Sequence, residues 1–440
     1  MASTYLSRTP ASTGNQSTYT FSGWIKKCGS GSVQQIIGSY YGNQSRYAFF
    51  QFNSDDTLSF FSGNYTTAST TTQSANKQTS RLFRDPSAWY HIVLSVDTTQ
   101  ATATDRVKLY VNGVQETWDT GYAYNLDPSQ NDTHFFNVTT NAMEVGAMNN
   151  NQYFNGSMSH VHWIDGTAYD ASTFGQEDAT TRIWKPKTAP SVTYGTNGFF
   201  LKFENSANMD LDSSPNNLTF STSGTLTQTV DTPSNVFATL NPLYPYTSTG
   251  AFTNGNTAPS DYNNTQGIVG TLGVSTGKWY YEVKINGNAP SEIGMVGWGA
   301  RDNGAINYSG GEAYDYCRYL LYANYYNNAS ATAISGASAY SSGDICGCAL
   351  DLDGNKIYWY KNGVLENTGG TTITASSTAG NYFPLVRNGN GSNIQCNFGN
   401  GYFGTTPVAS AGSNGNGAIF EYDVPTGYYA LNTKNINTYG

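Results

Sequence analysis

The sequence predicts an all-β protein with two antiparallel β-sandwich domains in tandem. Almost every periodic segment is short and alternates apolar with polar residues, and the spacers are rich in Gly, Asn, Ser and Asp. An apolar strand followed by an Asn-Gly hairpin occurs once in each half, at 89–114 and at 345–364. No segment shows the apolar periodicity of a helix of three or more turns.

We expect residues 1–205 to form the first domain and residues 236–440 the second, and each is long enough to enclose a core. The stretch 206–235 is polar and rich in turn residues, so it is predicted to be a linker or a crossing loop. The candidate strands of the first domain are "TYTFSGWIKK", "YAFFQF", "TLSFFSG", "WYHIVLSVD", "VKLYVNGV", "MSHVHWID" and "FFLKFEN". Those of the second include "GKWYYEVKI", "YFPLVR", "NIQCNFG" and "AIFEYDV".

The composition excludes several partners. Charged residues make up 12% of the chain and the net charge is -9, which argues against nucleic acid because phosphate binding needs a clustered basic face. The start, "MASTYLSRTPAS", lacks the basic and apolar segments of a signal peptide. No window approaches the ~18 apolar residues of a membrane span, so we expect a protein made in a cytosol without membrane insertion.

Longer stretches resemble known families. "WYHIVLSVDTTQATATDRVKLYVNGV" followed by "YFNGSMSHVHWIDGTAYDASTFG" resembles the laminin-G-like branch of the concanavalin-type lectin fold. "GKWYYEVKI", "EIGMVGWG", "GDICGCALDLDGNKIYWYKNGV" and "NIQCNFG" look like a SPRY domain. Both families are two-sheet jelly-roll sandwiches. With the joining text "YGTNGFFLKFEN" and "DTPSNVFATLNPL", the combination resembles virion proteins of marine bacteriophages and related aquatic viruses, which implies a fibre, decoration or attachment component.

Because the concanavalin-like fold also houses glycoside hydrolases, we looked for catalytic carboxylates. Those sites place acids on one strand as E-x-D-x-x-E, so that two of them flank a glycosidic bond about 5 Å apart. The nearest match has Glu421 and Asp423, with Thr426 where the last acid should stand. We therefore expect a protein that is not an enzyme.

Metal ligation has little support in the sequence. His160 and His162 lie two apart on a predicted strand, but a pair without a third ligand favours structural histidines. Asp165 and the aspartates of "DLD" at 210–212 are compatible with a calcium ion, since some laminin-G-like relatives bind one, although no ligand set can be assigned. We expect no other cofactor. The cysteines are predicted to be buried free thiols: Cys28, Cys317, Cys346, Cys348 and Cys396.

Aromatic residues in turn-rich segments are the candidate binding residues. A tyrosine or tryptophan ring offers a flat apolar face with a polar handle, suited to stacking on a sugar or contacting a protein. Alternatively, these rings fill the rims of the sandwiches or pack between subunits. The candidates are Tyr40, Tyr41, Asn43, Trp118, Tyr122, Tyr124, Tyr314, Tyr316, Tyr325 and Tyr326.

The first functional hypothesis is a non-enzymatic virion surface protein, of fibre or adhesin type, that binds glycans of the host surface. The alternative is a structural decoration or connector protein that binds other virion proteins and no sugar. A polysaccharide depolymerase is a minor alternative. We expect other virion proteins as partners and a homo-oligomer, for which a trimer is one compatible arrangement, located in the virion after synthesis in the host cytoplasm.

Overall fold

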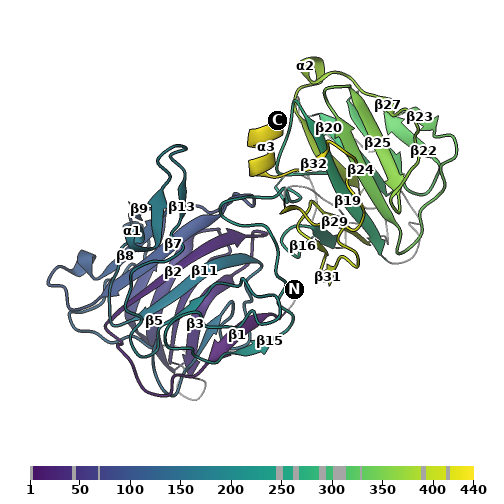
Figure 1. The fold of residues 1–440 in the computed structure, drawn as a ribbon. Helices are drawn as coiled ribbons and strands as arrows, with labels where there is room; N and C mark the ends of the chain where they lie inside the picture. Colours follow the sequence, from purple (N-terminus) through teal and green to yellow (C-terminus); the bar gives the residue numbers. More distant parts are fainter. Residues whose placement is uncertain are drawn as a thin grey trace. The chain divides into compact units, whose positions relative to one another are not determined.

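The chain divides into two compact units, Met1–Gln228 and Thr229–Gly440. The structure, a computed structural model, describes residues 3–41, 46–67, 70–243, 251–260, 267–286, 294–300, 314–327, 330–387, 393–412 and 417–440. Each unit is a sandwich of two sheets whose strands are almost all antiparallel (Figure 1), so the predicted fold class is confirmed.

The first unit pairs a seven-stranded sheet with a six-stranded one. In spatial order, the seven-stranded sheet contains β15 (Ser221–Ser223), β1 (Tyr5–Arg8), β10 (Ala142–Val145), β3 (Gln34–Tyr41), β4 (Arg46–Phe52), β5 (Leu58–Thr67) and β6 (Thr70–Gln78). The six-stranded sheet contains β14 (Phe199–Leu201), β11 (Gly156–Asp165), β2 (Thr18–Lys27), β7 (Tyr90–Asp97), β8 (Val107–Val111) and β9 (Val114–Glu116). The smaller elements are η1 (Ala103–Asp105), α1 (Ala171–Phe174), β12 (Gly175–Glu177) and β13 (Trp184–Pro186).

The second unit repeats this plan. Its six-stranded sheet contains β18 (Ile268–Val269), β28 (Tyr382–Arg387), β20 (Met295–Ala300), β21 (Asp315–Tyr319), β22 (Asn324–Asn327) and β23 (Ser330–Ala333). Its seven-stranded sheet contains β26 (Val364–Leu365), β25 (Lys356–Lys361), β24 (Ile345–Asp351), β19 (Lys278–Asn286) and β29 (Asn393–Asn397), with β27 (Thr371–Thr372) on β25 and β32 (Tyr429–Ala430) on β19. The smaller elements are β16 (Ala251–Thr253), β17 (Ala258–Ser260), β30 (Tyr402–Phe403), β31 (Thr406–Pro407), α2 (Ser376–Ala379) and α3 (Thr433–Tyr439).

The helices of the described residues are all short, and none has the length and apolar character needed to cross a membrane.

Alternating side chains build one core between the sheets of each unit. In the first unit, the ring of Phe21 on β2 meets that of Phe50 on β4 edge to face, with centroids 5.8 Å apart. In the second, Tyr281 on β19 meets Trp298 on β20 in the same way at 5.4 Å. Aromatic contacts therefore join the two sheets in both units.

Part of the segment expected to be a linker belongs to the first sandwich. β15 pairs with β1, and Phe220 is buried in the first core. The carboxylate of Asp212 accepts hydrogen bonds from the backbone N–H groups of Phe200 and Leu218, both at 2.8 Å. A single phenylalanine among polar residues gives no periodic signal, which is why composition alone indicated a loop.

The two Asn-Gly hairpins form the same corner. Asn112 and Asn362 both adopt a φ of 49°, which a tight primed turn requires. The Oδ1 atoms of Asn112 and Asn362 accept hydrogen bonds from the backbone N–H groups of His91 and Ile345, each at 2.8 Å. Gly363 follows with a φ of 80°, and a Cβ added there would lie 2.7 Å from the Tyr422 ring.

Gly363→Ala is therefore expected to destabilise the second unit through two effects, the left-handed backbone and the contact with Tyr422. Gly369→Ala is the matched control, because Gly369 has a φ of 84° but open space around the added Cβ. We expect the control to lose about 1 kcal/mol of unfolding free energy in chemical denaturation and Gly363→Ala clearly more. Equal losses would show that the ring above the corner has no steric role.

Candidate functional site

Three aromatic rings share the outer face of the seven-stranded sheet of the first unit. On β4, Ala48 and Phe50 point into the core, so the alternating Tyr47 and Phe49 point away from it. Phe61 on β5 lies opposite Phe49. The three centroids are 5.0 to 6.0 Å apart, with interplanar angles of 7 to 19°. We call Tyr47, Phe49 and Phe61 the aromatic face.

A row of neutral polar side chains runs beside the aromatic face. Gln35, Gln51 and Ser59 lie in register across β3, β4 and β5. The Nε2 atom of Gln35 donates to Oε1 of Gln51 at 2.5 Å, and Nε2 of Gln51 donates to Oδ1 of Asn53 at 2.9 Å. Ser59 Oγ also donates to Asn53 Oδ1, at 2.9 Å. These mutual bonds hold amide groups in fixed orientations next to the rings.

Two tyrosines predicted from the sequence lie at the β6 end of this face. Asn76 on β6 stands opposite Phe61 and hydrogen bonds to Tyr122. Tyr124 packs edge to face on Tyr122, with centroids 5.8 Å apart, and its side chain is 64% exposed. Burial raises the pKa of Tyr122 above its ordinary value, at which the hydroxyl is already protonated at neutral pH.

Trp118 occupies a different position from these tyrosines. Its ring packs against the first core, and its indole Nε1 donates to the carbonyl of Val107 at 2.9 Å. Lys77 lies 6.0 Å from the centre of this ring and forms an ion pair with Asp127 at 2.5 Å. These contacts fix the segment that carries Tyr122 against β6.

The remaining first-unit candidates lie on β3 or outside the described residues. Tyr40 lies opposite Tyr47, next to the aromatic face, and Tyr41 lies opposite Arg46, with alternation directing it to the other face. Asn43 lies outside the residues that the structure describes.

Three of the four second-unit candidates face inward. Tyr314 packs against the second core, and Tyr325 stacks on Trp359 with centroids 5.5 Å apart. Tyr316 is buried, and its hydroxyl accepts a hydrogen bond from the N–H of Thr374 at 3.0 Å. Tyr326 instead belongs to an apolar cluster on the outer face of the six-stranded sheet.

The signal for the aromatic face lies in two predicted strands and not in the turn-rich segments. The strings "YAFFQF" and "TLSFFSG" each contain two adjacent phenylalanines. Because successive side chains on a strand alternate, one ring of each pair must point away from the core.

The histidine pair on β11 is divided by a β-bulge. The register shifts between Ser159 and His162, and His160 adopts a φ of 49°. His162 stacks on Phe200 with centroids 3.8 Å apart, and its Nδ1 lies 2.9 Å from the hydroxyl of Tyr194. Within the described part of the chain, no three His, Cys, Asp or Glu residues form a group that could hold a metal ion.

The aspartates considered for calcium are engaged with N–H donors. Asp165 accepts hydrogen bonds from the backbone N–H groups of Asn15 at 2.7 Å and Asn197 at 3.0 Å. Asp212 likewise accepts from backbone groups around it, including Ser214 at 2.8 Å. These carboxylates therefore connect loops of the first unit. The predicted state of the cysteines is confirmed, since all five are free and buried.

Burial lowers the pKa of all four histidines: His91, His134, His160 and His162. For His91 and His134 the pKa falls to about 3. Such a side chain takes up its proton more readily in the unfolded state, whose pKa is about 6.5. Their contribution to stability is therefore complete above that pH and is lost as the pH falls toward 3. We expect the first unit to melt more than about 5 °C lower at pH 5 than at pH 7.

Hydrogen exchange followed by mass spectrometry checks this for each unit separately, after correction for the intrinsic pH dependence of exchange. The second unit contains no histidine, and burial raises the pKa of its Glu282 to about 7, so acidification to pH 5 should not destabilise this unit and it is the internal control. Equal loss of protection in both units on acidification would contradict the assignment to the buried histidines.

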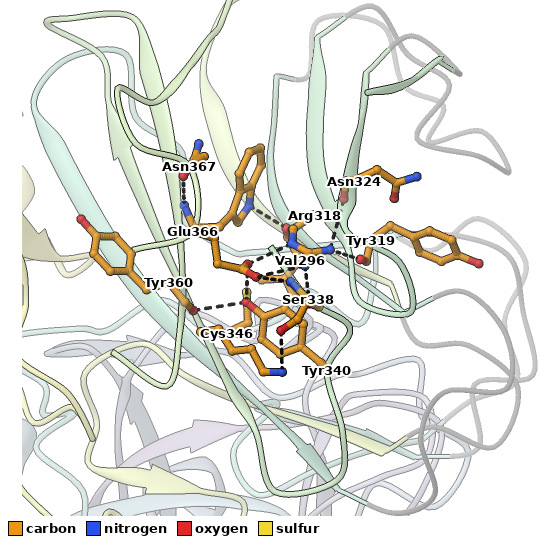
Figure 2. A network of polar contacts seen from close by, with 12 residues as sticks. Val296, Arg318, Tyr319, Asn324, Ser338, Tyr340, Cys346, Tyr360, Glu366 and Asn367 are labelled. Atoms are coloured by element: carbon orange, nitrogen blue, oxygen red, sulfur yellow. Dashed lines mark hydrogen bonds and ion pairs between the residues drawn. The ribbon is translucent and has the colours of Figure 1, made fainter. Parts of the chain in front are cut away.

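A buried arginine organises one end of the second sandwich (Figure 2). Arg318 on β21 is 0% exposed and forms a two-pronged ion pair with Glu366, at 3.0 and 3.1 Å. Its Nη2 also donates to the carbonyl of Ser338 at 2.7 Å, and its Nη1 to that of Asn324 at 3.2 Å. The hydroxyl of Tyr340 donates to Glu366 at 2.9 Å.

The same guanidinium donates to the carbonyls of Tyr319 and Tyr322. Arg318 therefore holds the turn between β21 and β22, on which the Tyr322 side chain is 57% exposed. Since the charge is enclosed by its own chain, Arg318 positions this turn and does not offer a cation to a ligand.

Glu366→Ala is expected to cost about 3 kcal/mol of unfolding free energy, because it leaves the buried guanidinium without its counter-charge. Glu177→Ala is the matched control, since the Arg182–Glu177 pair has side chains 78% and 52% exposed. Chemical denaturation should show a loss below about 1 kcal/mol for the control. Similar losses for both variants would rule out a structural role for the buried pair.

The geometry defines a protein of two concanavalin-type sandwiches in series, one with an aromatic sheet face. Residues 2–172 match the family model of the concanavalin A-like lectin/glucanases superfamily, and residues 278–401 match that of the SPRY domain. The chain therefore carries a laminin-G-like, concanavalin A-like domain followed by a SPRY domain. The two family resemblances of the sequence are confirmed, whereas the viral setting stays a prediction.

Among known proteins, the chain is similar to the E3 ubiquitin-protein ligase RKP of Arabidopsis thaliana, with 29% identity over 124 residues. The match covers 28% of this chain and 9% of that ligase. The SPRY domain of human HERC1 is 20% identical, with 30% of this chain and 88% of that chain covered and a TM-score of 0.24. Another human SPRY domain is 18% identical, covering 32% and 90%, with a TM-score of 0.25.

Proposed function

We propose that this chain is a non-enzymatic binding protein whose first unit attaches to glycans through the aromatic face. The observation that carries the proposal is the set of near-parallel rings of Tyr47, Phe49 and Phe61 on an outer sheet face, beside the amide row of Gln35 and Gln51. The rings of Tyr47 and Phe49 are only partly buried.

Sugar rings present apolar C–H faces and polar hydroxyl edges, and this face has a counterpart for each. The exposed parts of Tyr47 and Phe49 supply an apolar plate, and the hydroxyl of the partly buried Tyr122 supplies a polar group, while the buried amides of Gln35 and Gln51 hold the strands beneath the rings. The side chains of the row are uncharged, which favours neutral sugars. A single site of this kind binds at roughly millimolar Kd, and repetition in an assembly raises avidity by ~10²- to 10⁴-fold.

The proposed setting is the surface of a virus particle, where the chain would act as a fibre or adhesin. The support for this setting is the resemblance of the combined sequence, including "YGTNGFFLKFEN" and "DTPSNVFATLNPL", to virion proteins of aquatic viruses. Partners in this setting are other virion proteins, further copies of the chain and a host-surface glycan, with no nucleic acid and no membrane insertion.

A structural decoration protein is the second candidate, and one observation favours it. The turn that Arg318 holds between β21 and β22 presents Tyr322, whose side chain is 57% exposed, for a contact with another protein. Catalysis has less support, because Glu421 and Asp423 lie outside any strand and Glu421 accepts a hydrogen bond from the N–H of Ala409 at 2.7 Å. The ubiquitin ligase activity belongs to the plant relative, and this chain matches only 9% of that protein.

Tyr47→Ala and Phe49→Ala are expected to weaken glycan retention about tenfold each, because each removes part of the apolar plate. The measurement is binding of the full chain to an array of neutral and acidic oligosaccharides. Tyr322→Ala is the matched control, since it removes an exposed tyrosine of the second unit.

If Tyr322→Ala reduces glycan retention as strongly as Tyr47→Ala, the proposed location of the site is wrong. A full chain that binds no glycan on the array, even when multimerised on beads, would favour the decoration hypothesis. Release of reducing ends from a polysaccharide would revive the depolymerase hypothesis.

A further inference from the structure

The chain closes several of its own sheet edges. The backbone of Leu126 exchanges hydrogen bonds with Asn76 along the outer edge of β6, at 2.7 and 3.0 Å. Beside β18, the N–H of Asn241 donates to the carbonyl of Val269 at 2.8 Å. Beside β29, the N–H of Cys396 donates to the carbonyl of Thr257, also at 2.8 Å. Such covers prevent an edge strand from pairing with another chain.

The edge at β23 is different. All four residues of β23, Ser330 to Ala333, are exposed, and none is charged or proline. In the part of the chain that the structure describes, only β22 pairs with β23 (Figure 1). β23 therefore has no charged side chain and no proline, and none of the described segments covers it in the way that normally protects an edge.

The hydrogen-bond pattern of β22 and β23 shows which groups face outward. The N–H of Ile334 donates to the carbonyl of Ala323 at 2.8 Å, so this pair is a hydrogen-bonded one. In an antiparallel ladder such pairs alternate with non-bonded ones, so Thr332 also bonds to β22. Ala331 and Ala333 consequently direct their N–H and C=O groups to the open edge.

We propose that β23 pairs antiparallel with β23 of a second copy of this chain, joining two six-stranded sheets into one. A two-fold axis perpendicular to the sheet keeps the outer faces of both copies on the same side. Residues that pair across the axis must then point to the same face of the sheet, so their sequence numbers differ by an even number. If Thr332 lies opposite Thr332 of the second copy, Ala331 of each copy lies opposite Ala333 of the other. Ala331 and Ala333 are the residues whose backbone groups point outward.

A second copy fits this edge because the strand complements itself. The paired side chains are small, so the two backbones can approach closely, and two threonines face each other at the axis. Tyr326 lies opposite Ala331 on the neighbouring strand, and its ring packs against Tyr319 of β21, so it leaves the edge of β23 clear. The paired segments are short compared with a stable interface, which buries ~1,600 Å², so we expect a dimer that forms only at raised concentration.

Cysteine cross-linking of the full chain tests the register. All five native cysteines are buried, so an introduced thiol supplies the reactive site. Mild oxidation of Thr332→Cys should give a disulfide-linked dimer on a non-reducing gel. Ala331→Cys alone should not cross-link, whereas a mixture of Ala331→Cys and Ala333→Cys should. Ser342→Cys, at an exposed residue away from β23, measures random collision.

Analytical ultracentrifugation of chains without an introduced cysteine provides the second readout. Ala331→Pro removes an outward N–H without removing a bond to β22, and Ala333→Lys adds a charge at the edge. Both should abolish the concentration-dependent dimer, with Ser342→Lys as the matched control and circular dichroism to verify folding.

A chain that stays monomeric up to millimolar concentration would overturn the proposal. So would a dimer that Ala331→Pro and Ala333→Lys leave intact, or cross-linking no faster at position 332 than at 342. None of these outcomes depends on glycan binding, so the test is independent of the function proposed for the first unit.

Discussion

Every strand turns half of its side chains to each face of its sheet, and a two-sheet sandwich can bury only the inner faces. The outer faces must then be polar, covered or used. In the first unit, Phe174 and Trp184 cover the outer face of β7 and β11, and in the second Phe237 and Phe420 cover β19 and β24. The opposite sheet of the first unit keeps partly exposed aromatic rings on its outer face, and that face carries the glycan site that we propose.

The same constraint links the two Asn-Gly corners. Each corner extends beyond the sheet, where a glycine with positive φ leaves its backbone open on one side. An aromatic ring from the covering segment closes that side in both units, since a Cβ on Gly113 would lie 2.7 Å from Trp184 and one on Gly363 equally close to Tyr422. Two sandwiches with little sequence in common therefore solve one local problem in the same way, which explains why the hairpin occurs twice.

The sequence was sufficient for features with local causes. Strand alternation predicted both cores, and Asn-Gly predicted both corners, because each is determined by neighbours along the chain. The candidate site depended on register between strands. Phe49 and Phe61 meet only because β4 and β5 pair in one alignment, and Tyr325 faces the core because of its place on β22. The bulge at His160 likewise interrupts the alternation that had placed two histidines on one face. No local pattern contains this information.

A few partly exposed aromatic rings and a tyrosine hydroxyl give a sugar little to bind, since each hydrogen bond replaces one made with water. Useful adhesion therefore needs several sites held together, and what holds them must leave the aromatic face free. The open edge of β23 meets this condition, because pairing there uses backbone groups and no residue of the aromatic face. Pairing through that edge would double the number of sites without altering any of them, and the effective concentration of the second site would supply the affinity that the single face lacks.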